Sequence, residues 1–66
     1  MKLYYKGTKK EVKEGDVLTS FDGKKYFAYY WREPSHGTGK ITVTKHIEDS
    51  TDCAEYYVSV FNLEWR

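Results

Sequence analysis

The sequence predicts an all-β fold, a single domain formed by a small barrel of about five short antiparallel strands. Three observations support this prediction. Aromatic residues, which are enriched in strands, are abundant, with seven Tyr, three Phe and two Trp among 66 residues. Most of these rings fall in two short runs, residues 26–31 and 56–61. Turn signals separate the apolar runs, and no segment carries the apolar stripe of an amphipathic helix.

The N-terminal part of the chain is expected to form short strands joined by tight turns. Residues 3–5 are apolar or aromatic, the pair Lys6-Gly7 is a turn candidate, and residues 8–12 then return antiparallel. A second turn at Glu14-Gly15 leads into a strand over residues 16–21. The large apolar residues of that strand are Val17, Leu18 and Phe21.

A hairpin at Asp22-Gly23 is the clearest local signal in the sequence. Two residues of this kind between apolar runs favour a type I′ turn, in which both central residues have positive φ. Residues 24–32 are then the partner strand, which ends before Pro34. Alternation along this strand places Phe27, Tyr29 and Trp31 on one face and Tyr26, Ala28 and Tyr30 on the other. Both faces are apolar, as expected for a strand that bends through a small barrel.

The second half of the chain begins with a loop over residues 35–39, whose composition makes it flexible. Residues 40–47 form the next strand, with Ile41, Val43 and Ile47 inward and Thr42, Thr44 and His46 outward. An acidic turn over residues 48–52 and a strand over residues 55–60 follow. Near Ser59–Phe61 the apolar positions shift by one residue and continue at Phe61, Leu63 and Trp65, which indicates a bulge or a short 3₁₀ turn.

Short strands, tight turns and this late shift resemble an SH3-like barrel, in which a single 3₁₀ turn separates the last two strands. An OB-like barrel is the alternative, but that fold usually needs a longer chain and often a helix. We therefore expect residues 1–66 to form one SH3-like domain.

Charge and cysteine content narrow the classes of function. The formal net charge is +1 and the isoelectric point is about 7.8, whereas a dedicated nucleic-acid-binding domain usually has an isoelectric point above about 9. The single cysteine, Cys53, is expected in a reducing compartment. Neither a signal peptide nor a transmembrane helix is evident. The sequence therefore predicts a cytoplasmic protein without a membrane partner.

No motif in the sequence predicts catalysis, a cofactor or a metal. The run Gly37-Thr38-Gly39-Lys40 lacks the spacing and the following helix of a phosphate-binding loop. The candidate metal ligands are His36, His46, Asp49, Asp52 and Cys53, and none has the spacing of a zinc or calcium site. A Cys–His pair could be imagined, but nothing orients the base. We therefore expect no enzyme activity.

A surface of aromatic and basic side chains is the best functional signal. Tyr29, Trp31 and Arg32 lead directly into the bend at Glu33-Pro34, and Tyr, Trp and Arg are enriched at the energetic centres of protein interfaces. The full set of expected binding residues is Tyr29, Trp31, Arg32, His36, Lys40 and Tyr57. The competing interpretation is that individual rings, Trp31 among them, fill the core.

Several parts of the chain resemble one group of proteins. These parts are Tyr4-Tyr5-Lys6-Gly7, Gly15-Asp16, Trp31-Arg32-Glu33-Pro34, the strand from Lys40 to Val43, and the segment from Glu55 to Trp65. The chain here is similar to short bacteriophage-encoded proteins, although Val58 stands where proline is expected. The resemblance implies a phage accessory protein in bacterial cytoplasm, and it carries over no active site.

The sequence therefore predicts a non-enzymatic binding module that docks an aromatic face on a host or phage protein. Nucleic-acid binding is one alternative, in which the rings stack on bases and Lys24, Lys25 and Lys40 meet phosphates. Sequestration of a small nucleotide is a second alternative. Self-association into a homo-oligomer through the aromatic face is a third.

Overall fold

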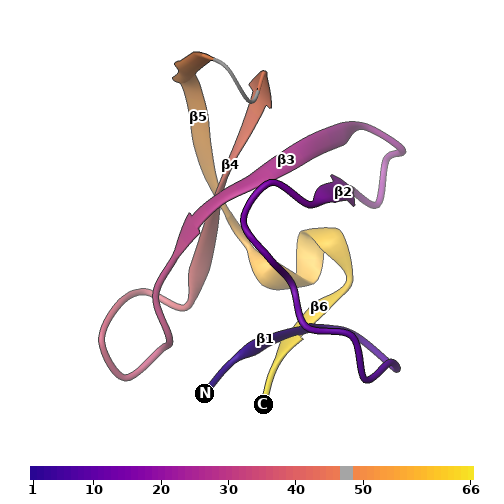
Figure 1. Cartoon of the computed structure of the whole chain (residues 1–66), viewed down its shortest axis with the longest axis vertical. Coiled ribbons are helices and arrows are strands. Elements are labelled where there is room, and N and C mark those ends of the chain that lie inside the picture. Colours follow the sequence, from indigo (N-terminus) through magenta and orange to yellow (C-terminus); the bar gives the residue numbers. More distant parts are fainter. Residues whose placement is uncertain (47–48) are drawn as a thin grey trace.

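The computed structural model describes residues 1–46 and 49–66 and confirms the all-β class (Figure 1). In chain order the elements are β1 (Leu3–Tyr5), β2 (Val17–Thr19), β3 (Lys25–Trp31), β4 (Lys40–His46), β5 (Asp49–Tyr57), the 3₁₀ helix η1 (Val58–Phe61) and β6 (Leu63–Trp65). The part of the chain that the structure describes contains six strands, where about five were expected, and it contains no α-helix.

The six strands form two antiparallel sheets, so the expected closed barrel is not observed. One sheet has the order β2-β3-β4-β5, and the other pairs β1 with β6. Residues 8–12 do not form a full strand beside β1. An isolated bridge pairs Tyr4 with Glu11, and backbone hydrogen bonds flank it from Tyr5 N–H to the Lys10 carbonyl and from Val12 N–H to the Leu3 carbonyl. Residues 9–14 are mostly charged and contain only Val12 as an apolar residue, so they gain little from a buried strand.

The core lies between the two sheets and η1. Its buried apolar residues are Leu3, Val12, Leu18, Tyr26, Ala28, Ile41, Val43, Phe61 and Leu63. Phe61 packs edge-on against two rings, with its centroid 5.7 Å from both Tyr26 and Tyr56. Such perpendicular ring pairs add about 0.5–1.5 kcal/mol beyond the burial of area. This ring cluster ties η1 to β3 and β5.

The turn at Asp22-Gly23 is not of type I′. Gly23 has positive φ, but Asp22 does not. Gly23 N–H donates to the Ser20 carbonyl, and Ser20 N–H donates to the Lys24 carbonyl. These bonds define a three-residue loop with Gly23 in the left-handed region, which is the next most common hairpin after the two-residue forms. The longer loop ends β2 at Thr19 and leaves Phe21 outside the strand, 84% exposed.

A bulge in β3 overturns the expected alternation. Ala28 pairs with Val43 and Tyr30 pairs with Thr42, so Tyr29 is an extra residue in the ladder. An extra residue moves each following side chain of the strand to the opposite face of the sheet. Tyr30 is consequently exposed instead of sharing the buried face of Ala28, and Trp31 packs against the core.

Most of β4 follows the expected pattern. Ile41 and Val43 are fully buried, as predicted, but Thr44 was expected outward and is also buried. Its hydroxyl donates to the His46 carbonyl, which satisfies the buried oxygen. The prediction of an acidic turn over residues 48–52 was wrong for residues 49–52, which begin β5. Ile47 and Glu48, which were assigned to a strand and to that turn, lie outside the described residues.

The expected 3₁₀ turn is confirmed. η1 spans Val58–Phe61 and interrupts the predicted strand over residues 55–60. Asn62 follows with φ 56°, in the left-handed region, which Asn tolerates better than most residues. This reversal turns the chain so that Leu63 is buried and β6 runs antiparallel to β1.

A tyrosine holds the 6–16 segment against β1. The Tyr5 hydroxyl donates to the Asp16 carboxylate over 2.9 Å, and the same oxygen accepts from the Lys13 N–H. Burial, together with the bond to Asp16 and its negative charge, raises the pKa of Tyr5 to about 12.

The stabilising effect of this phenol is expected to depend on pH. Because the pKa of Tyr5 is higher in the folded state than its ordinary value of 10.0, its contribution is complete below pH 10 and is lost as the pH rises through 12. The stability difference between the native chain and Tyr5→Phe should therefore shrink over that interval. Urea unfolding at several pH values measures the difference, and NMR of the Tyr5 ring gives its pKa directly. Titration of that ring near pH 10 would contradict the expectation.

Candidate binding surface

The outer face of the four-stranded sheet carries a group of exposed aromatic and charged side chains. Residues directly opposite in an antiparallel pair lie on the same face of the sheet. The register therefore places Tyr30, Thr42 and Glu55 in one row, and Lys40 and Tyr57 in the next. Ile41 and Val43, which alternate with Lys40 and Thr42 along β4, point to the core.

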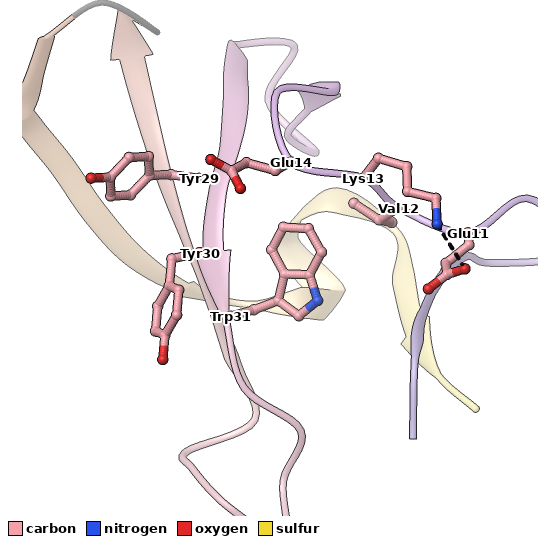
Figure 2. Close-up of a pocket in the computed structure, with 7 residues that line it drawn as sticks. All are labelled: Glu11, Val12, Lys13, Glu14, Tyr29, Tyr30 and Trp31. Carbon is pink, nitrogen blue, oxygen red and sulfur yellow. Dashed lines mark hydrogen bonds and ion pairs between the residues drawn. The ribbon is translucent and has the colours of Figure 1, made fainter.

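We define the tyrosine surface as Tyr29, Tyr30, Tyr57, Arg32 and Lys40. The exposed fractions of its rings are 40% for Tyr29, 51% for Tyr30 and 65% for Tyr57. The bulge places two of these rings side by side in sequence on one side of β3, and Figure 2 shows both pointing away from Trp31. These three rings are exposed and therefore contribute little to the core of this small chain.

The two cations of the tyrosine surface are held in place by its rings. The Lys40 ammonium lies 4.7 Å from the centroid of the Tyr57 ring and 4.0 Å from the Glu55 carboxylate. The Arg32 Nε donates to the Tyr30 hydroxyl over 2.7 Å. Arg32 forms no ion pair with any carboxylate side chain of residues 1–46 and 52–66. Its charge is thus available to a ligand.

Trp31 lies next to Tyr30 and Arg32 and lines a pocket with them, but its ring does not share their exposed face. Its indole points to the opposite side of β3, toward Val12, and lines a pocket of about 260 Å³ between β3 and residues 11–14 (Figure 2). The side chain is half-buried and packs against the core. The expectation that Trp31 shares one surface with Tyr29 was wrong, because the bulge separates them.

His36 lies beside the N-terminus and contacts Glu33, with its Nδ1 2.7 Å from Glu33 Oε1. The N-terminal ammonium binds the other oxygen of that carboxylate. Hydrogen bonds from the N-terminal ammonium, Ser35 and His36 lower the pKa of Glu33 to about 2. The Ser35 hydroxyl approaches the same Nδ1 atom, at 3.4 Å. A nucleophile and an orienting carboxylate must occupy opposite ring nitrogens, so this arrangement does not form a catalytic triad.

Sequence reasoning identified part of this surface. The structure brings together Tyr29, Arg32, Lys40 and Tyr57, whereas the indole of Trp31 points to the other side of β3 and His36 contacts Glu33. Tyr30 was missed, as were Thr42 and Glu55, which lie in the same row on this face. The outward position of Thr42 did follow from alternation. Which residues lie beside it depends on the strand register and on the bulge, and no local sequence pattern reports either of these.

Among the described residues, no group of three or more His, Cys, Asp or Glu side chains is arranged to hold a metal ion. The described part of the chain also has no helix with the length and apolar content to span a membrane. No family model, curated protein or solved structure matches the chain.

Proposed function

We propose that this protein is a non-enzymatic binding module that docks its tyrosine surface on a protein partner. One observation carries the proposal: three exposed tyrosines and two cations lie together on the outer face of one sheet. Tyr and Arg dominate the energetic centres of protein interfaces because they combine large apolar area with directional polar groups. A small rigid sheet presents such groups with little loss of side-chain freedom on binding.

The charges on this face favour a protein over a nucleic acid. Glu55 is half-exposed and lies in the same row as Tyr30 and Thr42, beside the row formed by Lys40 and Tyr57. A carboxylate at this position repels a phosphate backbone, whose binding depends on unopposed cations. Mixed charges around tyrosines are typical of a protein interface. The overall charge of +1 agrees with this preference.

An SH3-like arrangement is part of the proposal. Its support is the pairing of β1 with β6 and the position of η1 directly before β6. The sequence resemblance to short phage proteins supports a role as a phage accessory protein. On this proposal the partner is a host or phage protein in bacterial cytoplasm.

Affinity capture from bacterial lysate, with and without nuclease, tests the proposal. The native chain should retain a nuclease-resistant protein, and Tyr57→Ala and Tyr30→Ala should each reduce capture at least about tenfold, as expected for truncated hot-spot tyrosines. The matched control is Phe21→Ala, since Phe21 is also an exposed ring but lies on the β2–β3 turn. Capture of nuclease-sensitive material alone, or equal losses in the control, would count against docking through this surface.

A further inference from the structure

The tyrosine surface ends in a pocket of about 190 Å³, formed where the β3–β4 loop folds against the sheet. The polar side chains that line it are Tyr30, Arg32, Thr38, Lys40, Thr42 and Glu55, and Trp31 and Gly37 complete the lining. These residues come from three of the four strands of the sheet, β3, β4 and β5, and from the β3–β4 loop. The pocket is therefore built by the fold and does not depend on a single flexible segment.

The pocket fixes the position of Arg32 from two sides. The Tyr30 hydroxyl accepts a hydrogen bond from the Arg32 Nε and orients the plane of the guanidinium. On the other side, Gly37 lies so close that a Cβ at that position would be 2.8 Å from the Cβ of Arg32. Only glycine allows the loop to lie against the stem of Arg32. The other N–H groups of the guanidinium donate to no partner in residues 1–46 and 52–66, and Arg can bind a planar acceptor through two parallel hydrogen bonds.

The charges that line the pocket define the kind of ligand. Arg32 and Lys40 contribute two positive charges and Glu55 contributes one negative charge, which leaves a net charge of +1. Lys40 is already paired with Glu55, so the uncompensated cation is Arg32. One carboxylate neutralises such a pocket. A phosphate monoester, which carries close to two negative charges, would leave an excess of negative charge beside Glu55.

We propose that this pocket binds a carboxylate side chain from an acidic segment of the protein partner. This inference rests on the proposed function, since it assigns a chemistry to the partner that the tyrosine surface docks. Arg32 forms two parallel bonds to the carboxylate, Tyr30 positions the guanidinium, and the hydroxyls of Thr38 and Thr42 supply further donors. The acidic segment then continues over the exposed tyrosine rings.

A peptide titration followed by NMR tests the pocket without the partner. The probe is an acetylated, amidated tetraglutamate peptide, and the corresponding tetraglutamine peptide is the uncharged control. Tetraglutamate should produce saturable shifts of the Arg32 Nε–H signal and of the Gly37, Thr38 and Lys40 amides. Arg32→Gln should weaken this binding at least about tenfold, because it removes a charge-assisted bidentate contact.

A matched variant and a gain of affinity make the test specific. Arg66→Gln removes a charge of the same type that pairs with Glu64 and lies 4.8 Å from the Tyr4 ring centroid. It should leave tetraglutamate binding within about twofold of the native value, because salt screens the interaction of the peptide with a distant surface charge. Glu55→Gln removes the repulsive carboxylate and should strengthen binding about threefold or more.

Three results would overturn the inference: no saturable shifts with tetraglutamate, equal weakening by Arg32→Gln and Arg66→Gln, or tighter binding of inorganic phosphate than of tetraglutamate. The titration is independent of the capture experiment. If tetraglutamate does not bind while Tyr57→Ala still abolishes capture, docking through the tyrosine surface stands and the proposal of an acidic segment is wrong. If tetraglutamate binds as expected while Tyr57→Ala leaves capture unchanged, the pocket binds carboxylates but the tyrosine surface is not the docking site.

Discussion

Phe61→Ala is expected to remove most of the stability of this protein. Phe61 is only 4% exposed and contacts the rings of Tyr26 and Tyr56 in perpendicular geometry. Truncation of a buried Phe typically costs 3–5 kcal/mol through lost transfer energy and the cavity left behind. A domain of this size has about 3–10 kcal/mol in total, at 0.05–0.15 kcal/mol per residue. Urea unfolding followed by circular dichroism should show a largely unfolded chain or a greatly lowered midpoint.

Phe21→Ala is the matched control for Phe61→Ala, since it makes the same chemical change at a ring that is 84% exposed. Its effect on the free energy of unfolding should stay within about 0.5 kcal/mol, as for most surface substitutions. Similar losses in the two variants would contradict the assignment of Phe61, and not Phe21, to the core.

Trp31→Ala is expected to destabilise the fold by about 2–3 kcal/mol. The indole is half-buried, packs against the core and covers Val12 from the β3 side. The expected loss is therefore below the 3–5 kcal/mol of a fully buried Trp. Thermal unfolding should show a lower midpoint, whereas Tyr57→Ala should leave the midpoint nearly unchanged because that ring is exposed.

A conservative variant separates packing from recognition at this position. Trp31→Phe keeps most of the apolar area and should recover most of the stability lost in Trp31→Ala. It should also retain capture of the partner, because Trp31 lies on the other side of β3 from Tyr29 and Tyr30. Full stability combined with lost capture in Trp31→Phe would instead place Trp31 in the interface.

The sequence carried enough information for the class of fold and for several elements. Aromatic and β-branched runs predicted strands, and the one-residue shift at Ser59–Phe61 predicted η1, because both signals depend on neighbouring residues only. The bulge at Tyr29 was missed, since a strand with rings on both faces looks regular whether or not one residue is extra. Whether residues 8–12 close a barrel depends on tertiary packing, which local patterns do not report.

The candidate surface was also predictable only in part, where its residues could be recognised from local sequence. The cations Arg32 and Lys40 followed from residue type and from their place beside the loop, and Tyr57 was expected to flank the face. Tyr30 and Glu55 were not predicted, because their positions depend on the bulge and on the pairing of β4 with β5. The pocket around Arg32 also depends on the approach of Gly37, a tertiary contact that the glycine-rich composition of the loop does not specify.

The pairing of β1 with β6 has a consequence for cooperativity. The ladder begins with Tyr5 and Leu63, so it closes a loop that contains residues 6–62. Compared with the three-residue loop at residues 21–23, closing this loop costs about 2–3 kcal/mol more in chain entropy. A two-stranded sheet does not meet that cost alone, but burial of Leu3 and Leu63 contributes roughly 1.5–3 kcal/mol each. The ends of the chain therefore stay paired only while the core is formed, which makes the molecule a single cooperative unit.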